Sequence, residues 1–346
     1  MKGILKDKPA PGVLFAEQIP EPMPSHGEVL VKVAATSICG TDVHLYEWTK
    51  SAQAFNPTIP LVMGHESAGT VVAIGPGVTR LKAGDRVAVE SHIFCGACYF
   101  CRTGDAHNCL EMRLFGLTWD GAFAEYFKVP ERVCFPLPET IPLEVGALFE
   151  PCGVAVHALQ RAGGSAEGAS VMITGAGPIG LVLVQLCMGG GATRVVAVEP
   201  NPFRRKLAEQ MGAEAVDPTS TDMAELARRL SPRRGGFDLA FECSAVESNT
   251  PMLMEALRRE GTLVTVGHPG RAVPVDVAAH INKKGITLRG IFGRRVWDTW
   301  ELLLALVESG RLDLGALVTH RLGLREFERA VHLLREDAAK ILILPQ

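Results

Sequence analysis

Four of the nine cysteines lie within fifteen residues, at positions whose spacing is typical of a metal site. They are Cys95, Cys98, Cys101 and Cys109. Thiolates at this spacing suit tetrahedral zinc, and a complete shell of four cysteines leaves no coordination position open, so the predicted role is structural. An iron–sulfur cluster fits less well, because the last gap is long and no proline follows Cys109. Unrelated core cysteines are the other alternative.

A second, dispersed set of side chains could hold a catalytic metal. Cys39 lies in the segment SICGTDVHLYEW, and His65 and Glu66 lie in VMGHESAG. One thiolate, one imidazole and one carboxylate make an incomplete shell with room for water or substrate, as catalytic zinc requires. Spacing alone leaves a second interpretation open, in which His65 is a hydrogen-bonded structural residue of a glycine-containing turn.

A glycine motif of the form G-x-G-x-x-G predicts a dinucleotide site. Its glycines are Gly175, Gly177 and Gly180, and Glu199 follows about 20 residues later. The motif follows a predicted strand and opens a predicted helix, whose N-terminal N–H groups suit a pyrophosphate. An ordinary glycine-rich turn is the alternative interpretation.

Glu199 favours NAD over NADP, because a carboxylate accepts hydrogen bonds from ribose hydroxyls and repels a 2′-phosphate. Arg204 and Arg205 are close in sequence and weaken that preference, since an arginine beside the acid can accommodate the phosphate.

The elements that must position these residues fall into two groups. Up to about residue 150, short β-branched segments at 27–38, 69–75 and 84–90 are separated by turn signals, which predicts an irregular β-rich domain. Apolar runs then alternate with helical stretches, as in a doubly wound parallel sheet. The predicted strands are 170–174, 194–199, 237–243, 262–267 and 286–291, and the predicted helices are 178–188, 202–212 and 252–261.

Two helical stretches at 296–310 and 324–337 and a strand in KILILPQ end the chain. We expect this part to return to the first domain, which gives an α/β protein with a catalytic domain over 1–152 with 295–346 and a Rossmann domain over 153–294.

The composition excludes several classes of function. The 346 residues are 47% hydrophobic and carry 35 Lys+Arg against 38 Asp+Glu, so no electrostatic footprint for nucleic acid or an anionic membrane exists. No apolar run reaches the ~18 residues of a spanning helix, and the first residues do not resemble a signal peptide. A soluble cytoplasmic protein is expected.

Taken in order, these motifs resemble the zinc-dependent medium-chain alcohol dehydrogenase family over essentially the whole chain. The resemblance implies a GroES-like catalytic domain, a Rossmann domain, NAD, two zinc ions per chain, a small alcohol substrate and a homotetramer. It places the catalytic zinc on Cys39, His65 and Glu66, with Glu150 as an acidic residue beside the metal. It places a proton relay on Thr41 and His44. The remaining implied cofactor contacts are Ile179, Glu199, Arg204, Val266, Gly267, His268, Ile291 and Phe292.

Within that family the segments EPCGVAVH and GIFGRRVWDTW are most similar to the threonine dehydrogenases, which implies oxidation of L-threonine to 2-amino-3-oxobutanoate. The sequence departs from that branch at Cys152-Gly153-Val154, where Phe-Gly-Asn is usual, and at His268, where an apolar residue is usual. A polyol or vicinal-diol substrate is therefore the alternative. A non-enzymatic zinc- and nucleotide-binding redox sensor is an alternative of another class, against which the complete set of Cys39, Thr41, His44, His65 and Glu66 argues.

Overall fold

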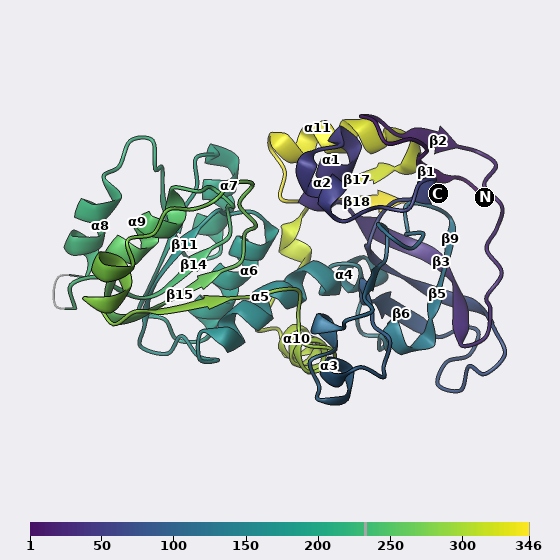
Figure 1. Cartoon of the computed structure of the whole chain (residues 1–346), viewed down its shortest axis with the longest axis horizontal. Helices are drawn as coiled ribbons and strands as arrows, with labels where there is room; N and C mark the ends of the chain where they lie inside the picture. The colour runs from purple at the N-terminus through teal and green to yellow at the C-terminus, as the bar shows by residue number, and fades with distance from the viewer. Residues whose placement is uncertain (232–233, 346) are drawn as a thin grey trace. The chain divides into compact units, whose positions relative to one another are not determined.

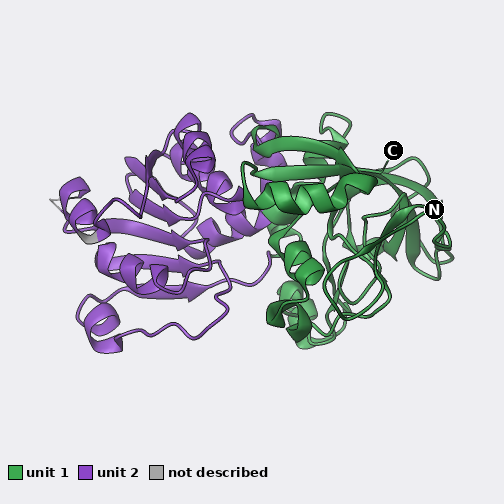
Figure 2. Cartoon of the chain, turned by 90° about the horizontal axis from the view of Figure 1, so that it is seen from above, with its two compact units in different colours: residues 1–151, 295–301, 314–346 green, residues 152–294, 302–313 purple. Residues whose placement is uncertain are grey.

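The computed structural model describes residues 1–231 and 234–345. The chain forms two compact units (Figure 2). Unit 1 consists of residues 1–151, 295–301 and 314–346, and unit 2 consists of residues 152–294 and 302–313. None of the helices in the described part of the chain combines the length and apolar character needed to cross a membrane.

Unit 1 is built on a seven-stranded sheet (Figure 1). Its order is β10 (Cys134–Pro136), β6 (Arg86–Val89), β5 (Glu66–Ile74), β3 (Glu28–Ser37), β18 (Lys340–Leu344) and β17 (Val318–Gly323), with β9 (Tyr126–Pro130) also paired to β3. Smaller sheets pair β1 (Gly3–Lys6) with β2 (Leu14–Ala16) and β4 (Leu61–Val62), and β7 (His92–Ile93) with β8 (Arg113–Leu114). The expected β-rich domain is confirmed, and the C-terminal strand β18 pairs with the end of β3.

Short helices of unit 1 connect these strands. They are α1 (Gly40–Glu47), α2 (Lys50–Ala54), α3 (Tyr99–Arg102), α4 (Leu143–Gly146) and α11 (Phe327–Arg335), with 3₁₀ turns at Ala106–Asn108, Glu131–Val133, Gly315–Leu317 and Leu324–Glu326. Trp297 and Trp300 pack on Phe135, and the indole of Trp300 donates a hydrogen bond to Glu90 Oε2 at 2.9 Å, so both tryptophans have a packing role in unit 1.

Unit 2 contains a six-stranded parallel sheet. Its order is β13 (Glu214–Val216), β12 (Arg194–Val198), β11 (Ser170–Thr174), β14 (Phe237–Glu242), β15 (Leu257–Thr265) and β16 (Thr287–Gly290). The helices are α6 (Pro178–Gly189), α7 (Pro202–Gln210), α8 (Met223–Leu230), α9 (Asn249–Ala256) and a π-helical segment (Val277–Asn282), while α5 (Phe149–Arg161) and α10 (Asp298–Glu308) carry residues of both units. The central strands β11 and β14 are buried along their whole length, which explains their continuous apolar sequences and confirms the Rossmann prediction.

Two of the differences from the predicted elements concern the end of a helix and the boundary between the two units. The helix expected over 252–261 ends at Ala256, and β15 begins at Leu257. A register shift occurs there between Phe237 and Leu239 of β14, and Glu260 has a positive φ of 60°, so the polar segment RREG forms a bulged strand instead of a helical turn. Residues 302–313, which the sequence grouped with the first domain, belong to unit 2, where Gln185 exchanges hydrogen bonds of 2.9 and 2.8 Å with the Asp313 backbone.

Candidate active site

The ends of two paired strands bring the candidate catalytic ligands of unit 1 together. In the antiparallel pairing of β3 and β5, Ser37 lies opposite Glu66. Cys39 follows two residues after Ser37, and His65 immediately precedes Glu66. The ligand atoms of Cys39, His65 and Glu66 consequently lie within 4.8 Å of one another. The 25 residues between Cys39 and His65 leave and return to the same sheet, so the pairing of β3 with β5 brings the two ligands together.

Asp42 contacts two of these ligands, and no role for it was predicted from the sequence. Its Oδ2 accepts a hydrogen bond from the Cys39 backbone N–H at 2.9 Å, and its Oδ1 lies 3.5 Å from His65 Nδ1. Burial of His65 would lower its pKa, but the Asp42 carboxylate and the Cys39 sulfur outweigh burial and raise it well above 6.5. The sequence feature that could have pointed to Asp42 is its position as an acidic residue at the third position of a helix, where it can cap the helix start.

The Glu66 carboxylate is only half satisfied by protein groups. Its Oε2 accepts hydrogen bonds from the Ser37 hydroxyl and from the Lys340 ammonium. Its Oε1 is buried and has no hydrogen-bond partner among the described residues. A buried carboxylate oxygen without a partner is costly, and a metal ion beside the Cys39 sulfur would satisfy it. The donor set therefore fits zinc.

Glu150 lies in the first turn of α5 and is buried. Burial raises the pKa of Glu66, and the negative charge of Glu150 raises it further, while Lys340 and His65 oppose both effects. The structure thus brings Glu150 close enough to Glu66 for their charges to interact. It also places Lys340 beside Glu66, a contact that was not predicted from the sequence.

Thr41 and His44 lie on α1, three residues apart and therefore on the same face of the helix. The Thr41 hydroxyl oxygen is 3.7 Å from the Cys39 sulfur. The His44 ring is exposed, and its Nδ1 lies 3.3 Å from the Thr49 hydroxyl. The two residues therefore lead from the ligand cluster to the protein surface.

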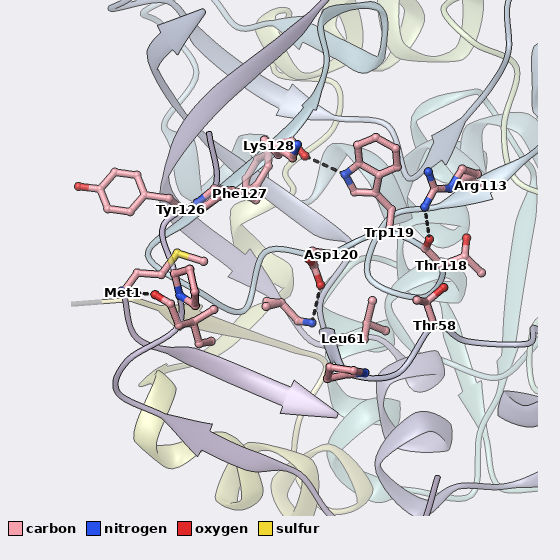
Figure 3. A pocket seen from close by; sticks show the side chains of 16 residues that line it. Met1, Thr58, Leu61, Arg113, Thr118, Trp119, Asp120, Tyr126, Phe127 and Lys128 are labelled. Carbon is pink, nitrogen blue, oxygen red and sulfur yellow. Dashed lines mark hydrogen bonds between the residues drawn. The ribbon is translucent and has the colours of Figure 1, made fainter. Parts of the chain in front are cut away.

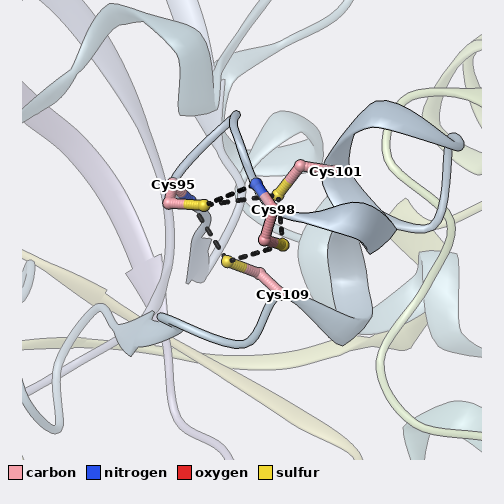
Figure 4. Close-up of side chains that lie close together, drawn as sticks. All are labelled: Cys95, Cys98, Cys101 and Cys109. Carbon is pink, nitrogen blue, oxygen red and sulfur yellow. Dashed lines mark hydrogen bonds between the residues drawn. The ribbon is translucent and has the colours of Figure 1, made fainter.

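The four-cysteine lobe of unit 1 gathers Cys95, Cys98, Cys101 and Cys109 with their sulfur atoms within 4.8 Å of one another (Figure 4). Backbone N–H groups of Ala97 and Cys98 each donate to the Cys95 sulfur at 3.3 Å. Backbone hydrogen bonds from Cys101 and Leu110 lower the pKa of Cys98 to about 6. Converging sulfurs with N–H groups that favour the thiolate fit a tetrahedral zinc ion.

The glycine motif of unit 2 leaves space where a cofactor phosphate is expected. A Cβ atom on Gly180 would lie 1.9 Å from the Gly175 carbonyl oxygen, so these two backbones are in direct contact. A Cβ on Gly177 would meet no atom of the described residues within 4 Å. Gly177 caps α6, so its open side faces the N–H groups that begin this helix. The arrangement fits a pyrophosphate at the helix start.

Glu199 follows β12 and is fixed beside this loop. Its Oε2 accepts from the Ala176 N–H at 2.8 Å, and its Oε1 accepts from the Asn201 N–H at 2.9 Å. The Arg204 N–H is held by the Asn201 side chain at 3.1 Å. The Arg205 guanidinium donates to the Glu199 and Pro200 carbonyls at 2.8 and 2.6 Å and pairs with Asp217. Arg205 is therefore already engaged by protein acceptors.

The remaining candidate cofactor residues follow the carboxyl ends of β15 and β16, at the sheet edge that also carries the glycine loop. The N–H groups of Val266 and Gly267 both donate to the Glu242 carbonyl, at 2.8 and 2.9 Å. The Ile291 N–H donates to the Thr265 carbonyl at 3.2 Å. The rings of His268 and Phe292 pack edge to face at 6.4 Å. Ile179 lies in the first turn of α6. Ligands of open parallel sheets bind at this edge.

Fold and site together define the class. Residues 25–139 match the family model of the alcohol dehydrogenase GroES-like domain, and residues 178–309 match that of the zinc-binding dehydrogenases. The chain belongs to the zinc-dependent medium-chain alcohol dehydrogenase family, and it is an oxidoreductase of the zinc-binding type. Membership argues against the non-enzymatic alternative.

More particularly, the chain is 41% identical over 339 residues to L-threonine 3-dehydrogenase of Pyrococcus abyssi, with 97% of this chain and 95% of that protein covered. Among solved structures it resembles 2R,3R-butanediol dehydrogenase from Bacillus subtilis, with a TM-score of 0.89, 32% identity and coverage of 100% and 99%. It also resembles a zinc-binding dehydrogenase from Sinorhizobium meliloti bound to NADP, with a TM-score of 0.88, 31% identity and 99% coverage of both chains.

Proposed function

We propose that this enzyme oxidises the secondary hydroxyl of L-threonine to the ketone of 2-amino-3-oxobutanoate with NAD⁺ as hydride acceptor. The observation that carries the chemistry is the convergence of Cys39, His65 and Glu66 in a chain of this family. The relationship to the Pyrococcus abyssi enzyme over nearly the whole of both chains supports the choice of threonine.

The catalytic zinc is assigned to Cys39, His65 and Glu66, with Glu150 beside it, and a structural zinc is assigned to the four-cysteine lobe. When bound, the catalytic ion supplies the Lewis acidity that lowers the pKa of the substrate hydroxyl, and the nicotinamide accepts the hydride. The side chain of Asp42 orients both Cys39 and His65, since it contacts the backbone of one and the ring of the other.

The hydroxyl proton leaves through α1. Thr41 is the first acceptor, because its hydroxyl lies 3.7 Å from the Cys39 sulfur and is therefore beside the ligand cluster. His44 receives the proton from Thr41, one helical turn away, and passes it to solvent from its exposed ring. An imidazole suits a proton shuttle near neutral pH.

The preference for NAD⁺ is assigned to Glu199. Its carboxylate ends the second strand of the nucleotide fold, where it can accept from both ribose hydroxyls and repel a 2′-phosphate. Arg205 does not offset this repulsion, because Asp217 and two carbonyl groups occupy its guanidinium. A solved relative binds NADP, so the efficiencies with NAD⁺ and NADP⁺ are compared to test this preference.

A vicinal diol is the second candidate substrate, favoured by the similarity to 2R,3R-butanediol dehydrogenase and by Cys152-Gly153-Val154. The test is the initial rate of NADH formation by the zinc-loaded enzyme with L-threonine, 2,3-butanediol, sorbitol and simple alcohols. A higher kcat/KM for L-threonine supports the proposal. A higher value for a diol or polyol transfers the assignment to that substrate and identifies residues 152–154 as the first positions to exchange.

The resemblance to the family also supports a homotetramer in the cytoplasm. Light scattering would then give a mass four times the 37.1 kDa of one chain.

A further inference from the structure

The short segment that leads to His65 is held along its length by a second segment. β4 ends at Val62, and Met63 and Gly64 follow before His65. Residues 121–123 pair with this segment through three backbone hydrogen bonds: Gly121 N–H to Val62 at 2.7 Å, Ala122 N–H to Gly64 at 2.9 Å and Phe123 N–H to Met63 at 2.8 Å. Each residue from Val62 to Gly64 therefore has a carbonyl fixed by the partner segment.

Glycines let the two backbones touch. Gly64 has a φ of +94° and Gly116 a φ of +73°, a conformation that side chains disfavour. A Cβ atom on Gly121 would lie 2.1 Å from the Gly64 carbonyl oxygen, and one on Gly116 would lie 2.5 Å from the same atom. Direct backbone contact therefore fixes the position of Gly64. It also fixes the backbone nitrogen of His65, which is bonded to the Gly64 carbonyl carbon.

Asp120 completes this arrangement with a side chain. Its Oδ1 accepts a hydrogen bond from the Val62 N–H at 2.9 Å, and Figure 3 shows the bond beside Leu61. The turn that carries Asp120 is itself fixed, because the Trp119 indole donates to the Lys128 carbonyl at 2.9 Å and Gly116 N–H donates to the Trp119 carbonyl at 2.8 Å.

The contact lies beside a cavity of about 300 Å³ to which Val62 and Asp120 both contribute. Asp120 is exposed, so water can compete for the Val62 N–H whenever the carboxylate withdraws. A carboxylate acceptor is stronger than water or a neutral oxygen, and it keeps this end of the segment paired.

We propose that Asp120 is a positioning residue for the catalytic zinc: by holding Val62 it fixes the segment that presents His65 and Glu66. The inference rests on the proposed zinc site. Asp120 does not touch the ligands and acts through three residues of backbone. Its removal is expected to let the Val62–Gly64 segment shift, which misaligns His65 with Cys39 while the four-cysteine lobe keeps its geometry.

The test compares the release of the two zinc ions from full-length Asp120→Ala, Asp120→Ser and Asp120→Asn enzymes into excess chelator, with a metal-sensitive dye. The release phase of the catalytic zinc is identified as the phase missing from His65→Ala. We expect Asp120→Ala and Asp120→Ser to release this ion about tenfold faster, as for other residues that orient ligands. Asp120→Asn keeps an acceptor oxygen but loses the charge, so its release rate should lie between those of Asp120→Ala and the wild type. The four-cysteine zinc serves as an internal control.

Glu131→Ala is the matched control variant. Glu131 also caps backbone N–H groups far away in sequence, with Arg80 N–H at 2.9 Å, but that segment carries no proposed ligand. It should leave both release phases unchanged. Equal release from Asp120→Ala, Asp120→Ser and wild type would overturn the proposal, and so would equal acceleration of both zinc ions, which would show a general loss of structure. A single release phase in the wild type would instead contradict the proposed zinc site itself.

Discussion

Lys340, in the last strand of the chain, donates a hydrogen bond to the carboxylate of Glu66, although 274 residues separate them. Both side chains are buried, and the Lys340 ammonium also donates to the Ile38 carbonyl at 3.1 Å. β18 reaches this position because it pairs with the end of β3, from which Cys39 follows. The C-terminal strand therefore supplies the counter-charge of a candidate zinc ligand.

Replacing Lys340 by Met should destabilise unit 1 strongly, because it leaves the buried Glu66 charge without its partner. We expect a loss of about 3–5 kcal/mol in the free energy of unfolding. All four tryptophans belong to unit 1, so urea unfolding followed by tryptophan fluorescence reports this unit. The control is Arg329→Met, which removes an exposed ion pair with Glu326 and should cost less than about 1 kcal/mol. An equal loss in the free energy of unfolding for the two substitutions would show that the buried ion pair stabilises unit 1 no more than the exposed one.

Thr41→Val tests the proton path. The substitution keeps the size and branching of the side chain and removes the hydroxyl beside Cys39, so kcat should fall about 100-fold while zinc content stays unchanged. Thr79→Val, at an exposed position, is the matched control and should keep wild-type turnover. An unchanged kcat in Thr41→Val would exclude the proposed relay.

Glu199→Ala tests the choice of cofactor. Loss of the carboxylate should reduce kcat/KM for NAD⁺ about 10- to 100-fold, as expected for hydrogen bonds to a charged group, and should improve the relative use of NADP⁺. Glu214→Ala removes an acid of the neighbouring strand that pairs with Arg194 at 2.7 Å, and it should change neither value. A Glu199→Ala enzyme that keeps the wild-type ratio of NAD⁺ to NADP⁺ efficiency would refute the assignment.

Asp238 gives unit 2 a stability that depends on pH. Burial would raise its pKa, but hydrogen bonds from Ser170, Arg258 and Arg234 prevail and lower the pKa to about 2. Because the folded-state pKa lies below the unfolded value, the stabilisation is complete above about pH 4 to 5 and is lost as the pH falls toward 2.

Asp238→Asn should therefore cost about 1–2 kcal/mol at pH 7, after allowance for solvent screening, and less at pH 3. Thermal unfolding followed by circular dichroism at pH 7, 5 and 3 measures this difference. Glu214→Gln, with its exposed side chain, serves as the control. A difference between Asp238→Asn and wild type that grows toward pH 3 would contradict the sign.

The sequence predicted the elements whose patterns are local. β11 is a continuous apolar run, and its predicted and observed bounds agree. The edge strand β13 was missed, because its three residues, Glu214–Val216, give no pattern of useful length. β17 was missed as well, since its half-exposed sequence VTHRLG lacks the apolar run of a buried strand.

Residues that reach the candidate site only because strands far apart in the sequence pair with each other could not be predicted. The four cysteines are close in sequence, so spacing alone indicated their cluster. Cys39 and His65 needed the family resemblance, because their proximity depends on the register of β3 and β5. Lys340 is one lysine in an apolar strand, and nothing in KILILPQ indicates which carboxylate it meets. Asp42 had a local signal as a helix cap, but its contact with His65 depends on the same sheet.

The most direct test of the central claim is the zinc content of His65→Ala beside Cys98→Ser, measured by mass spectrometry together with NADH formation. We predict two zinc ions per chain in the wild type. His65→Ala should retain one zinc, in the four-cysteine lobe, and form no NADH, whereas Cys98→Ser should keep the zinc at Cys39, His65 and Glu66. A His65→Ala enzyme that still binds two zinc ions, or that still oxidises the substrate at the wild-type rate, would contradict the account.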